Sequence, residues 1–319
     1  MNRYESEFKG KSCLVTGGAG FIGSNLSRHL ASIGAKVLVI DNFSTGRKEN
    51  ILDFQDLDIT LVESDISDQK KTEPFFSDVD FVFHQAAVPS VPRSLAEPML
   101  TNDSNVRGIL SVLENSRLSD VKKVVFAASS SAYGDSGVLP KSELMIPSPL
   151  SPYAVQKLTG EMYCRTYFDN YGLPTTSLRY FNVYGAYQDP NSEYSAVIPI
   201  FIKKALKDED ITIFGDGTTS RDFIFIEDVI QANLRAAVSY ESNGSVINIA
   251  YGQNSTLNDL ADIIIKKTGS KSNVIYEPFR KGDVLHSLAD LSEAKSLLGF
   301  NPQFDLISGL EKTIKFYTQ

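Results

Sequence analysis

Two side chains four positions apart could carry out acid–base chemistry. Tyr153 and Lys157 lie in the stretch SPYAVQKLTGEMY, where Ser151 can cap a helix and Pro152 can occupy its first position. This spacing puts both side chains on one helix face, one turn apart. A tyrosine titrates near ~10 and is a poor base at neutral pH, but an adjacent cation stabilises the phenolate and lowers its pKa. The pattern predicts a proton-transferring tyrosine, although the same spacing also occurs by chance on exposed helices.

A glycine-rich turn lies upstream of this pair. The stretch TGGAGFIGS places Gly17, Gly20 and Gly23 three residues apart, directly after an apolar run and before a segment with helical spacing. In a dinucleotide-binding turn the first glycine permits the bend, the second admits the pyrophosphate and the third allows close helix packing. The pyrophosphate would then lie at a helix N-terminus, where free N–H groups favour an anion.

Acidic residues end the next two apolar runs. Asp41 comes 18 residues after Gly23, close to the ~20-residue spacing of a ribose-binding acid. Asp41 would repel a 2′-phosphate, which favours NAD over NADP, whereas the nearby Arg47 is a counter-argument because arginine can bind that phosphate. Asp65 could accept a hydrogen bond from the adenine amino group, or it could serve only as a turn or N-cap residue.

The elements that position these residues follow an alternating pattern. Short β-branched runs separated by helical segments predict a doubly wound, parallel Rossmann sheet in an α/β fold. After about residue 180 the pattern becomes irregular, which predicts a smaller mixed α/β lobe, and one later run is expected to return to the first sheet. The predicted strands are 12–17, 36–41, 59–65, 79–87, 121–129 and the returning 243–252. We expect an NAD-binding domain of residues 1–180 plus about 226–250, and a substrate-binding lobe of 181–225 and 251–319.

Composition excludes several classes of protein. The chain has 319 residues, 42% of them hydrophobic, and a formal net charge of −8, which disfavours a nucleic-acid partner. Two cysteines, Cys13 and Cys164, are expected to be reduced thiols. Three scattered histidines predict no metal site. No apolar run approaches the ~18–20 residues of a membrane span and the N-terminus lacks a signal-like segment, so we expect a cytoplasmic protein.

Taken together, the motifs match a known family. TGGAGFIG, Tyr153-x-x-x-Lys157, LRYFNVYG (178–185) and SRDFIFIEDV (220–229) resemble the extended short-chain dehydrogenase/reductases over nearly the whole chain. Within that family the sequence is similar to UDP-sugar 4-epimerases. The segments AASSSAYGD, YQDPNSEYSAVIP and RKGDVLHSLADLS are most similar to enzymes of bacterial O-antigen synthesis that accept UDP-N-acetylglucosamine (UDP-GlcNAc) and UDP-N-acetylgalactosamine (UDP-GalNAc).

The resemblance implies a mechanism. Tyr153 removes the proton of the sugar 4-hydroxyl while a hydride moves from C4 to NAD, and the transient 4-keto sugar then rotates so that the hydride returns to its other face. Lys157 would also hold the nicotinamide ribose. The family places a serine four residues before the tyrosine of the Tyr-Gly pair, which here gives Ser129. Ser129 is also the first polar residue after an apolar strand, where a hydroxyl can reach the crevice and assist proton transfer.

The resemblance also implies two sets of binding residues. The expected cofactor contacts are Gly17, Gly20, Phe21, Ile22, Asp41, Asn42, Ser44, Thr45, Gly46, Asp65, Ile66, Gln85, Ala86, Ala87, Asn105, Tyr153, Lys157 and Tyr180. The expected UDP-sugar contacts are Pro89, Ser90, Ser129, Ser131, Tyr153, Asn182, Ala196, Val197, Arg221, Arg280 and Ser287. Asn182, Arg221 and Arg280 would bind the diphosphate. Ser287 replaces a large tyrosine of epimerases restricted to non-acetylated sugars, which leaves room for a 2-acetamido group without excluding the smaller sugars.

Several alternatives remain at this point. Related 4,6-dehydratases carry an Asp-Glu pair where this chain has Ser130 and Ser131, and the glutamate of the decarboxylases is also absent, so both activities are disfavoured. A UDP-glucuronate 4-epimerase is the main alternative, because Arg93 could bind the sugar carboxylate. A non-catalytic NAD-binding regulator is disfavoured because such a protein need not keep both Tyr153 and Lys157. Family resemblance further suggests a homodimer formed through helices near 103–116 and 154–171.

Overall fold

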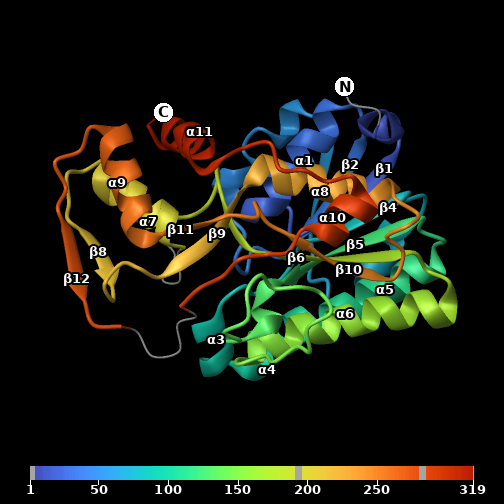
Figure 1. Cartoon of the computed structure of the whole chain (residues 1–319). Coiled ribbons are helices and arrows are strands. Elements are labelled where there is room, and N and C mark those ends of the chain that lie inside the picture. Colours follow the sequence, from blue (N-terminus) through green and yellow to red (C-terminus); the bar gives the residue numbers. More distant parts are fainter. Residues whose placement is uncertain (1–3, 191–195, 280–284, 319) are drawn as a thin grey trace.

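The core of the molecule is a parallel seven-stranded sheet (Figure 1). The computed structural model describes residues 4–190, 196–279 and 285–318. The strand order is β10-β6-β5-β4-β1-β2-β3, and every neighbouring pair is parallel. These strands are β1 Ser12–Thr16, β2 Lys36–Asp41, β3 Ile59–Glu63, β4 Phe81–His84, β5 Lys123–Ser129, β6 Thr175–Tyr180 and β10 Ser245–Ile249. The predicted doubly wound sheet is confirmed, and so is the late strand that returns to it.

Helices cover both faces of this sheet, as the continuous apolar strands require. On one face, side chains of β1 and β2 such as Val15 and Val39 pack with α1 and α8. On the other face, Phe126 and Val124 of β5 pack with α5 and α6. The helices are α1 Phe21–Ser32, α2 Gln69–Thr72, α3 Val91–Ala96, α4 Pro98–Asn102, α5 Gly108–Leu118, α6 Pro152–Tyr171, α7 Val197–Ala205, α8 Ile226–Val238, α9 Leu257–Thr268, α10 Ser292–Leu298 and α11 Leu306–Tyr317.

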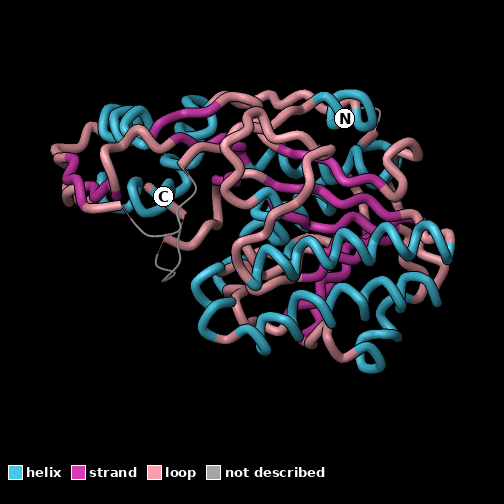
Figure 2. The backbone as a smooth tube through the Cα atoms, turned by 60° about the horizontal axis from the view of Figure 1, so that its bottom comes forward, coloured by secondary structure: helices cyan, strands magenta, loops and turns pink. Residues whose placement is uncertain are grey.

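Two small sheets lie beyond the main one, at the side where its strands end (Figures 1 and 2). One has the order β11-β9-β7 and the other pairs β12 with β8. Their strands are β7 Asn182–Tyr184, β8 Ile211–Phe214, β9 Ser220–Phe225, β11 Asn254–Thr256 and β12 Val274–Glu277. Apolar side chains of α7, α9 and α11 continue the core of the α1 and α8 face without a break. The domain boundaries drawn from the sequence stay a prediction.

Local sequence explains how the site elements begin and end. Ser151 caps α6 by accepting a hydrogen bond from the backbone N–H of Ala154 at 3.2 Å, and Pro152 takes the first helical position. The cap at Ser151 and the proline at the first helical position were both predicted from the sequence of residues 151–153. Gly172 ends the same helix in the left-handed conformation. In the described part of the chain no helix is both long and apolar enough to cross a membrane.

Candidate active site

The glycine turn between β1 and α1 has the geometry of a phosphate cradle. Gly17 has φ +72°, and a Cβ there would lie 2.6 Å from the backbone of Ala86. A Cβ on Gly23 would lie 2.2 Å from the carbonyl oxygen of Gly17. Gly20 precedes α1 without a side-chain cap, so the first N–H groups of the helix can bind an anion. These residues therefore fit the pyrophosphate of a dinucleotide.

Asp41 ends β2 and lines a large cavity together with the glycine turn. Its carboxylate accepts hydrogen bonds from the backbone N–H groups of Ala19 at 2.9 Å and Phe43 at 2.8 Å. Burial raises the pKa of Asp41, and the two backbone hydrogen bonds oppose that shift. Arg47, the sequence argument for NADP, forms ion pairs with Glu49 at 3.3 Å and Asp189 at 2.9 Å. Its charge is thus balanced by two carboxylates, which weakens that argument.

Asp65 has the turn role considered from the sequence, and its contact with adenine stays a prediction. Its carboxylate accepts hydrogen bonds from the backbone N–H of Ser67 at 2.8 Å and from the Asn42 amide at 3.0 Å. Burial raises the pKa of Asp65, but these hydrogen bonds outweigh it and the net shift is downward. Asp65 therefore closes a turn while it also lines the cavity.

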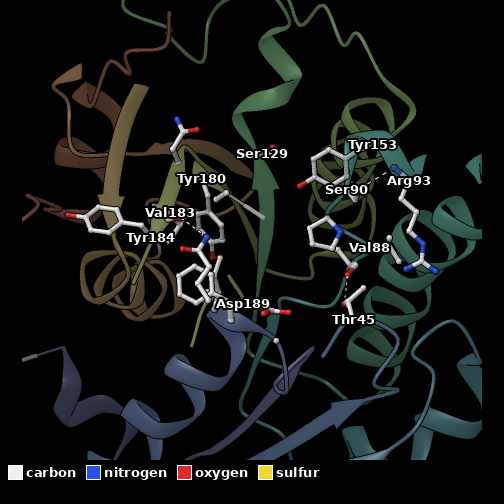
Figure 3. A pocket seen from close by; sticks show the side chains of 18 of the residues that line it. Thr45, Val88, Ser90, Arg93, Ser129, Tyr153, Tyr180, Val183, Tyr184 and Asp189 are labelled. Atoms are coloured by element: carbon white, nitrogen blue, oxygen red, sulfur yellow. Dashed lines mark hydrogen bonds between the residues drawn. The ribbon is translucent and has the colours of Figure 1, made fainter. Parts of the chain in front are cut away.

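Tyr153 and Ser129 meet at the carboxyl end of β5 (Figure 3). Ser129 is the last residue of β5, and its hydroxyl accepts a hydrogen bond from the Ser131 N–H at 3.2 Å. The Ser129 hydroxyl also acts on the Tyr153 side chain by lowering its pKa, and the Tyr153 backbone N–H donates to Ser94 Oγ at 3.1 Å. Both side chains line one cavity of about 1390 Å³ that also contains the glycine turn. The structure thus brings the predicted base and hydroxyl together beside the predicted cofactor site.

The electrostatics of Tyr153 differ from the sequence expectation. Burial raises the pKa of Tyr153, and the Ser129 hydroxyl only partly opposes this. Lys157 was expected to lower it, but its Nζ donates to the carbonyl oxygen of Ala127 at 2.8 Å and lies 5.0 Å from the centre of the Phe126 ring. Burial lowers the pKa of Lys157 to about 8. The expectation was wrong for the protein alone, because spacing on a helix does not reveal how strongly the surroundings exclude water.

His84 is the last residue of β4 and is buried near Lys157. Its Nδ1 lies 2.7 Å from the Thr16 hydroxyl, and its ring stacks on Phe126. Burial lowers the pKa of His84 to about 3, and the charge of Lys157 adds to the shift. The neutral ring therefore belongs to the folded state.

Acid should destabilise the protein through His84. Because the folded-state pKa is depressed, its stabilisation is complete above the unfolded value near ~6.5 and is lost as pH falls from there toward 3. We expect the free energy of unfolding to fall more steeply in wild type than in His84→Asn, by about 1.4 kcal/mol per pH unit. Urea titrations from pH 7 to pH 4 measure both slopes. If the free energy of unfolding fell equally with pH in the two proteins, His84 would not be the group whose protonation destabilises the fold.

Most of the predicted binding residues line this single cavity. Those of the cofactor set are Gly17, Gly20, Phe21, Ile22, Asp41, Asn42, Ser44, Thr45, Asp65, Ile66, Gln85, Ala86, Ala87, Tyr153 and Tyr180. Those of the UDP-sugar set are Pro89, Ser90, Ser129, Tyr153, Asn182, Ala196, Val197 and Arg221. Figure 3 shows Ser90, Arg93 and Tyr153 on one side of the cavity and Tyr180, Tyr184 and Asp189 on the other. The contacts to bound molecules themselves stay predictions.

Five predicted residues lie behind the wall of the cavity. Gly46 and Lys157 do not line the cavity. A Cβ on Gly46 would lie 2.8 Å from an Asp41 oxygen, and the Lys157 side chain is buried. The Ser131 hydroxyl is buried and has no hydrogen-bond partner among the described residues. Ser287 Oγ accepts hydrogen bonds from the Asp222 N–H at 3.2 Å and the Asn182 amide at 3.4 Å. The fifth is Asn105, and Arg280 lies outside the described residues.

Asn105 supports the cavity wall instead of lining it. It lies in a π-helical turn, Asp103–Arg107, and its side-chain oxygen accepts the Val88 N–H at 2.8 Å. Its amide donates to Gln156 Oε1 at 2.8 Å, which links the wall after β4 to the helix that carries Tyr153. A direct cofactor contact was expected from resemblance. The hydrogen bonds of the Asn105 side chain instead join the segment after β4 to α6.

The SRD motif supports the cavity from the smaller lobe. Arg221 lines the cavity, and its Nη1 donates to the carbonyl oxygens of Ser220 at 3.0 Å and Leu285 at 3.1 Å. The neighbouring Asp222 is buried and accepts backbone N–H groups from Tyr251 at 2.9 Å and Ala289 at 3.1 Å. Burial raises the pKa of Asp222 to about 6, against those hydrogen bonds. Asp222 thus fixes the strand that presents Arg221.

Replacing Asp222 by asparagine should destabilise the lobe. The side-chain amide would face backbone donors, and each buried group left unsatisfied costs about 1–3 kcal/mol. We expect a clear drop in the midpoint of urea unfolding for Asp222→Asn. Asp262→Asn, at an exposed position of α9, should match wild type. A midpoint for Asp222→Asn equal to that of this control would show that the carboxylate is dispensable.

Sequence reasoning missed much of the wall on the lobe side. Tyr187 lines the cavity with φ +67°, which is unusual for a non-glycine residue, and its ring lies 3.9 Å from the Arg28 guanidinium. Phe223, Glu277 and Phe279 also line it. No local signal marks these residues, because strands far apart in the chain bring them to the site.

Comparison with known proteins agrees with this geometry. A family model described as "NAD dependent epimerase/dehydratase family" matches residues 13–250. UDP-glucose 4-epimerase of Mycolicibacterium smegmatis is 37% identical over 309 residues, covering 95% of this chain and 97% of that protein. UDP-N-acetylglucosamine 4-epimerase from Methanobrevibacter ruminantium M1, solved with UDP-N-acetylmuramic acid, is 40% identical with a TM-score of 0.93, covering 97% and 99% of the two chains. A UDP-glucuronic acid 4-epimerase mutant from Bacillus cereus, solved with a fluorinated UDP-glucuronic acid and NAD, is 32% identical with a TM-score of 0.89, covering 97% and 99%.

This chain therefore belongs to the NAD dependent epimerase/dehydratase family, and its cofactor is NAD. Within that family it is similar to 4-epimerases that act on UDP-sugars. The resemblance drawn from the sequence motifs is confirmed at this level.

Proposed function

We propose that the protein interconverts UDP-GlcNAc and UDP-GalNAc by NAD-dependent 4-epimerisation. The observation that carries the proposal is the placement of Tyr153 and Ser129 together in the cavity that contains the glycine turn. This pair can remove and return the proton of a sugar hydroxyl held at the same place. Arg221 and Asn182, which line the cavity from the smaller lobe, are suited to a diphosphate.

The chain's own groups perform the proton chemistry. NAD, when bound, accepts the hydride from C4 and returns it. Tyr153 takes the proton from the sugar O4 and gives it back, while the Ser129 hydroxyl hydrogen-bonds that oxygen. Because burial raises the pKa of Tyr153, the reaction depends on positive charge near the phenolate, and Lys157 and the nicotinamide ring of bound NAD would supply it. Asp41 and the glycine turn, which line the same cavity, would hold the opposite end of the cofactor.

Two observations support an acetylated sugar. Ser287 is a small residue within 3.4 Å of the Asn182 amide, so no large side chain occupies this position next to the cavity. The similar M. ruminantium protein is described as a UDP-N-acetylglucosamine 4-epimerase. A small residue admits the larger sugar without rejecting UDP-glucose, so we expect activity on both.

UDP-glucuronate is the second candidate substrate. Arg93 lines the cavity and could bind a carboxylate, and the B. cereus relative is described with this type of sugar. However, Arg93 Nε already donates to Glu97 Oε2 at 3.0 Å. The Glu97 carboxylate thus balances the positive charge of Arg93, which the carboxylate of UDP-glucuronate would need. This favours a sugar without a carboxylate.

The substrate is tested by a direct assay. Purified protein is mixed with UDP-GlcNAc without added NAD, and UDP-GalNAc is measured by chromatography. UDP-glucose and UDP-glucuronate are run in parallel. Conversion of UDP-GlcNAc with little conversion of UDP-glucuronate is expected. The reverse order would replace the proposal by its second candidate, and no conversion of any of the three would overturn it.

We also propose that the protein is a homodimer that packs through α5 and α6. These helices lie side by side on the outer face of the sheet (Figures 1 and 2). On α6, Val155 is 49% exposed and Met162 is 60% exposed, which is unusual for apolar side chains. Light scattering after size exclusion should give twice the chain mass. Val155→Glu/Met162→Glu should give the mass of one chain.

A further inference from the structure

A buried ion pair joins the proposed catalytic helix, α6, to the neighbouring strand β6. Glu161 of α6 accepts two hydrogen bonds from Arg179 of β6, at 2.9 Å from Nε and 2.7 Å from Nη2. The side chains are 3% and 4% exposed. A buried pair often adds no more stability than well-packed apolar residues would, because both charges lose their hydration. Its position relative to the site therefore matters more than its contribution to stability.

The pair touches each element that positions the proposed catalytic groups. Glu161 follows Lys157 by one helical turn and lies on the same buried face. Arg179 is in register with Ala128, and the next residue of its strand is in register with Ser129. The Arg179 guanidinium also lies 4.7 Å from the centre of the Tyr133 ring, in the turn that begins at Ser129.

Tyr133 anchors that turn on its far side. Its hydroxyl donates to Asn248 Oδ1 of β10 at 2.7 Å, and the ring is fully buried. The contacts therefore run from α6 through Glu161 and Arg179 to Tyr133, and from there to the neighbouring strand. We propose that Glu161 and Arg179 are positioning residues, which hold Lys157 and the Ser129 turn in the arrangement that the reaction needs. This inference rests on the proposed function.

The charges around Lys157 indicate what Glu161 does. Lys157 faces Glu161 and Cys164 of its own helix, His84 of β4, and Arg179 through Glu161. Burial lowers the pKa of Lys157 to about 8, and among its neighbours the Glu161 carboxylate opposes this most strongly. His84 is neutral and supplies no compensating charge. Glu161 thus keeps Lys157 protonated near neutral pH.

The test measures Lys157 directly and the reaction separately. Protein labelled with 13C at lysine Cε is titrated by NMR, and the Lys157 signal is assigned by its absence in Lys157→Arg. In Glu161→Gln we expect the pKa of Lys157 to fall by about one unit. We expect kcat at pH 8 to fall about fivefold, with the alkaline limb moved to lower pH. The KM for UDP-GlcNAc should change less than about twofold.

Two further variants separate positioning from folding. Glu161→Gln leaves Arg179 without its partner, so Glu161→Gln/Arg179→Met removes both charges and should show a smaller fall in the Lys157 pKa in the same direction. Glu161→Asp retains the charge and should keep the alkaline limb near its wild-type pH. Glu227→Gln breaks an exposed ion pair with Lys312 and serves as the control. An unchanged Lys157 titration in both Gln variants would overturn the inference, whether or not the protein epimerises UDP-GlcNAc. An inactive wild type would contradict only the proposed function.

Discussion

Tyr153→Phe should abolish nearly all epimerisation while leaving the fold and ligand binding intact. The variant loses one hydroxyl, the group that lies in the cavity with Ser129 and would exchange a proton with the sugar. A positioned acid–base group contributes about 10²–10⁴-fold to rate, so kcat should fall by that factor. The ring remains in place, because the backbone N–H of residue 153 still donates to Ser94. Chromatography of the UDP-sugars measures the rate, and calorimetry measures UDP binding.

The control for this substitution is Tyr240→Phe. Tyr240 is 89% exposed and lies outside the cavity lining, so the same loss of a hydroxyl should leave kcat unchanged. If Tyr153→Phe retained wild-type turnover with its fold intact, the proton would have to move through another group. The role given to Ser129 would then also need revision.

Lys157→Met should lose activity by about 10²-fold or more, for an electrostatic reason. Burial raises the pKa of Tyr153, so its phenolate needs a cation within the same dry environment. The pKa of Lys157 is lowered to about 8, so this charge is present below that pH and is lost above it. Wild-type kcat should therefore fall on the alkaline side, and the small residual rate of Lys157→Met should lack that limb. A pH–rate profile from pH 6 to pH 10 measures both.

Lys123 offers a matched control at the opposite end of β5. It is also a buried lysine, and burial lowers its pKa to about 7. Its Nζ donates to the Ser239 carbonyl at 3.0 Å and the Ser242 hydroxyl at 3.2 Å, far along the strand from Ser129. Lys123→Met should lower the unfolding midpoint but keep the wild-type pH–rate profile. Equal losses of kcat in the two variants would mean that Lys157 acts only through stability.

The cofactor half of the site could be predicted because its signals are local. Gly17, Gly23 and Asp41 lie on consecutive elements, and their backbone requirements are visible in residue type and spacing. The cap at Ser151 likewise follows from three neighbouring letters. Such patterns depend on sterics and hydrogen bonds between residues that are close in the sequence, so residue type and spacing are enough to predict them.

The sugar-side wall of the cavity could not be predicted, because segments that are distant in the sequence form it. Tyr187, Phe223 and Glu277 reach the cavity only after three separate parts of the chain have come together. The upward shift of the Tyr153 pKa and the supporting role of Asn105 have the same origin. Both reflect burial and partners that are set by the whole fold, so spacing along a helix could not reveal them.

The return of β10 to the main sheet has a consequence for the order of synthesis. β6 pairs with β5 on one side and with β10 on the other. The 64 residues between β6 and β10 contain β7, α7, β8, β9 and α8, all of which are synthesised before β10 emerges. Until residue 249 has left the ribosome, β6 is an open edge strand with unpaired backbone groups. The half that binds the cofactor therefore cannot be completed before most of the sugar-side wall exists, and a nascent chain released earlier would expose an edge prone to aggregation.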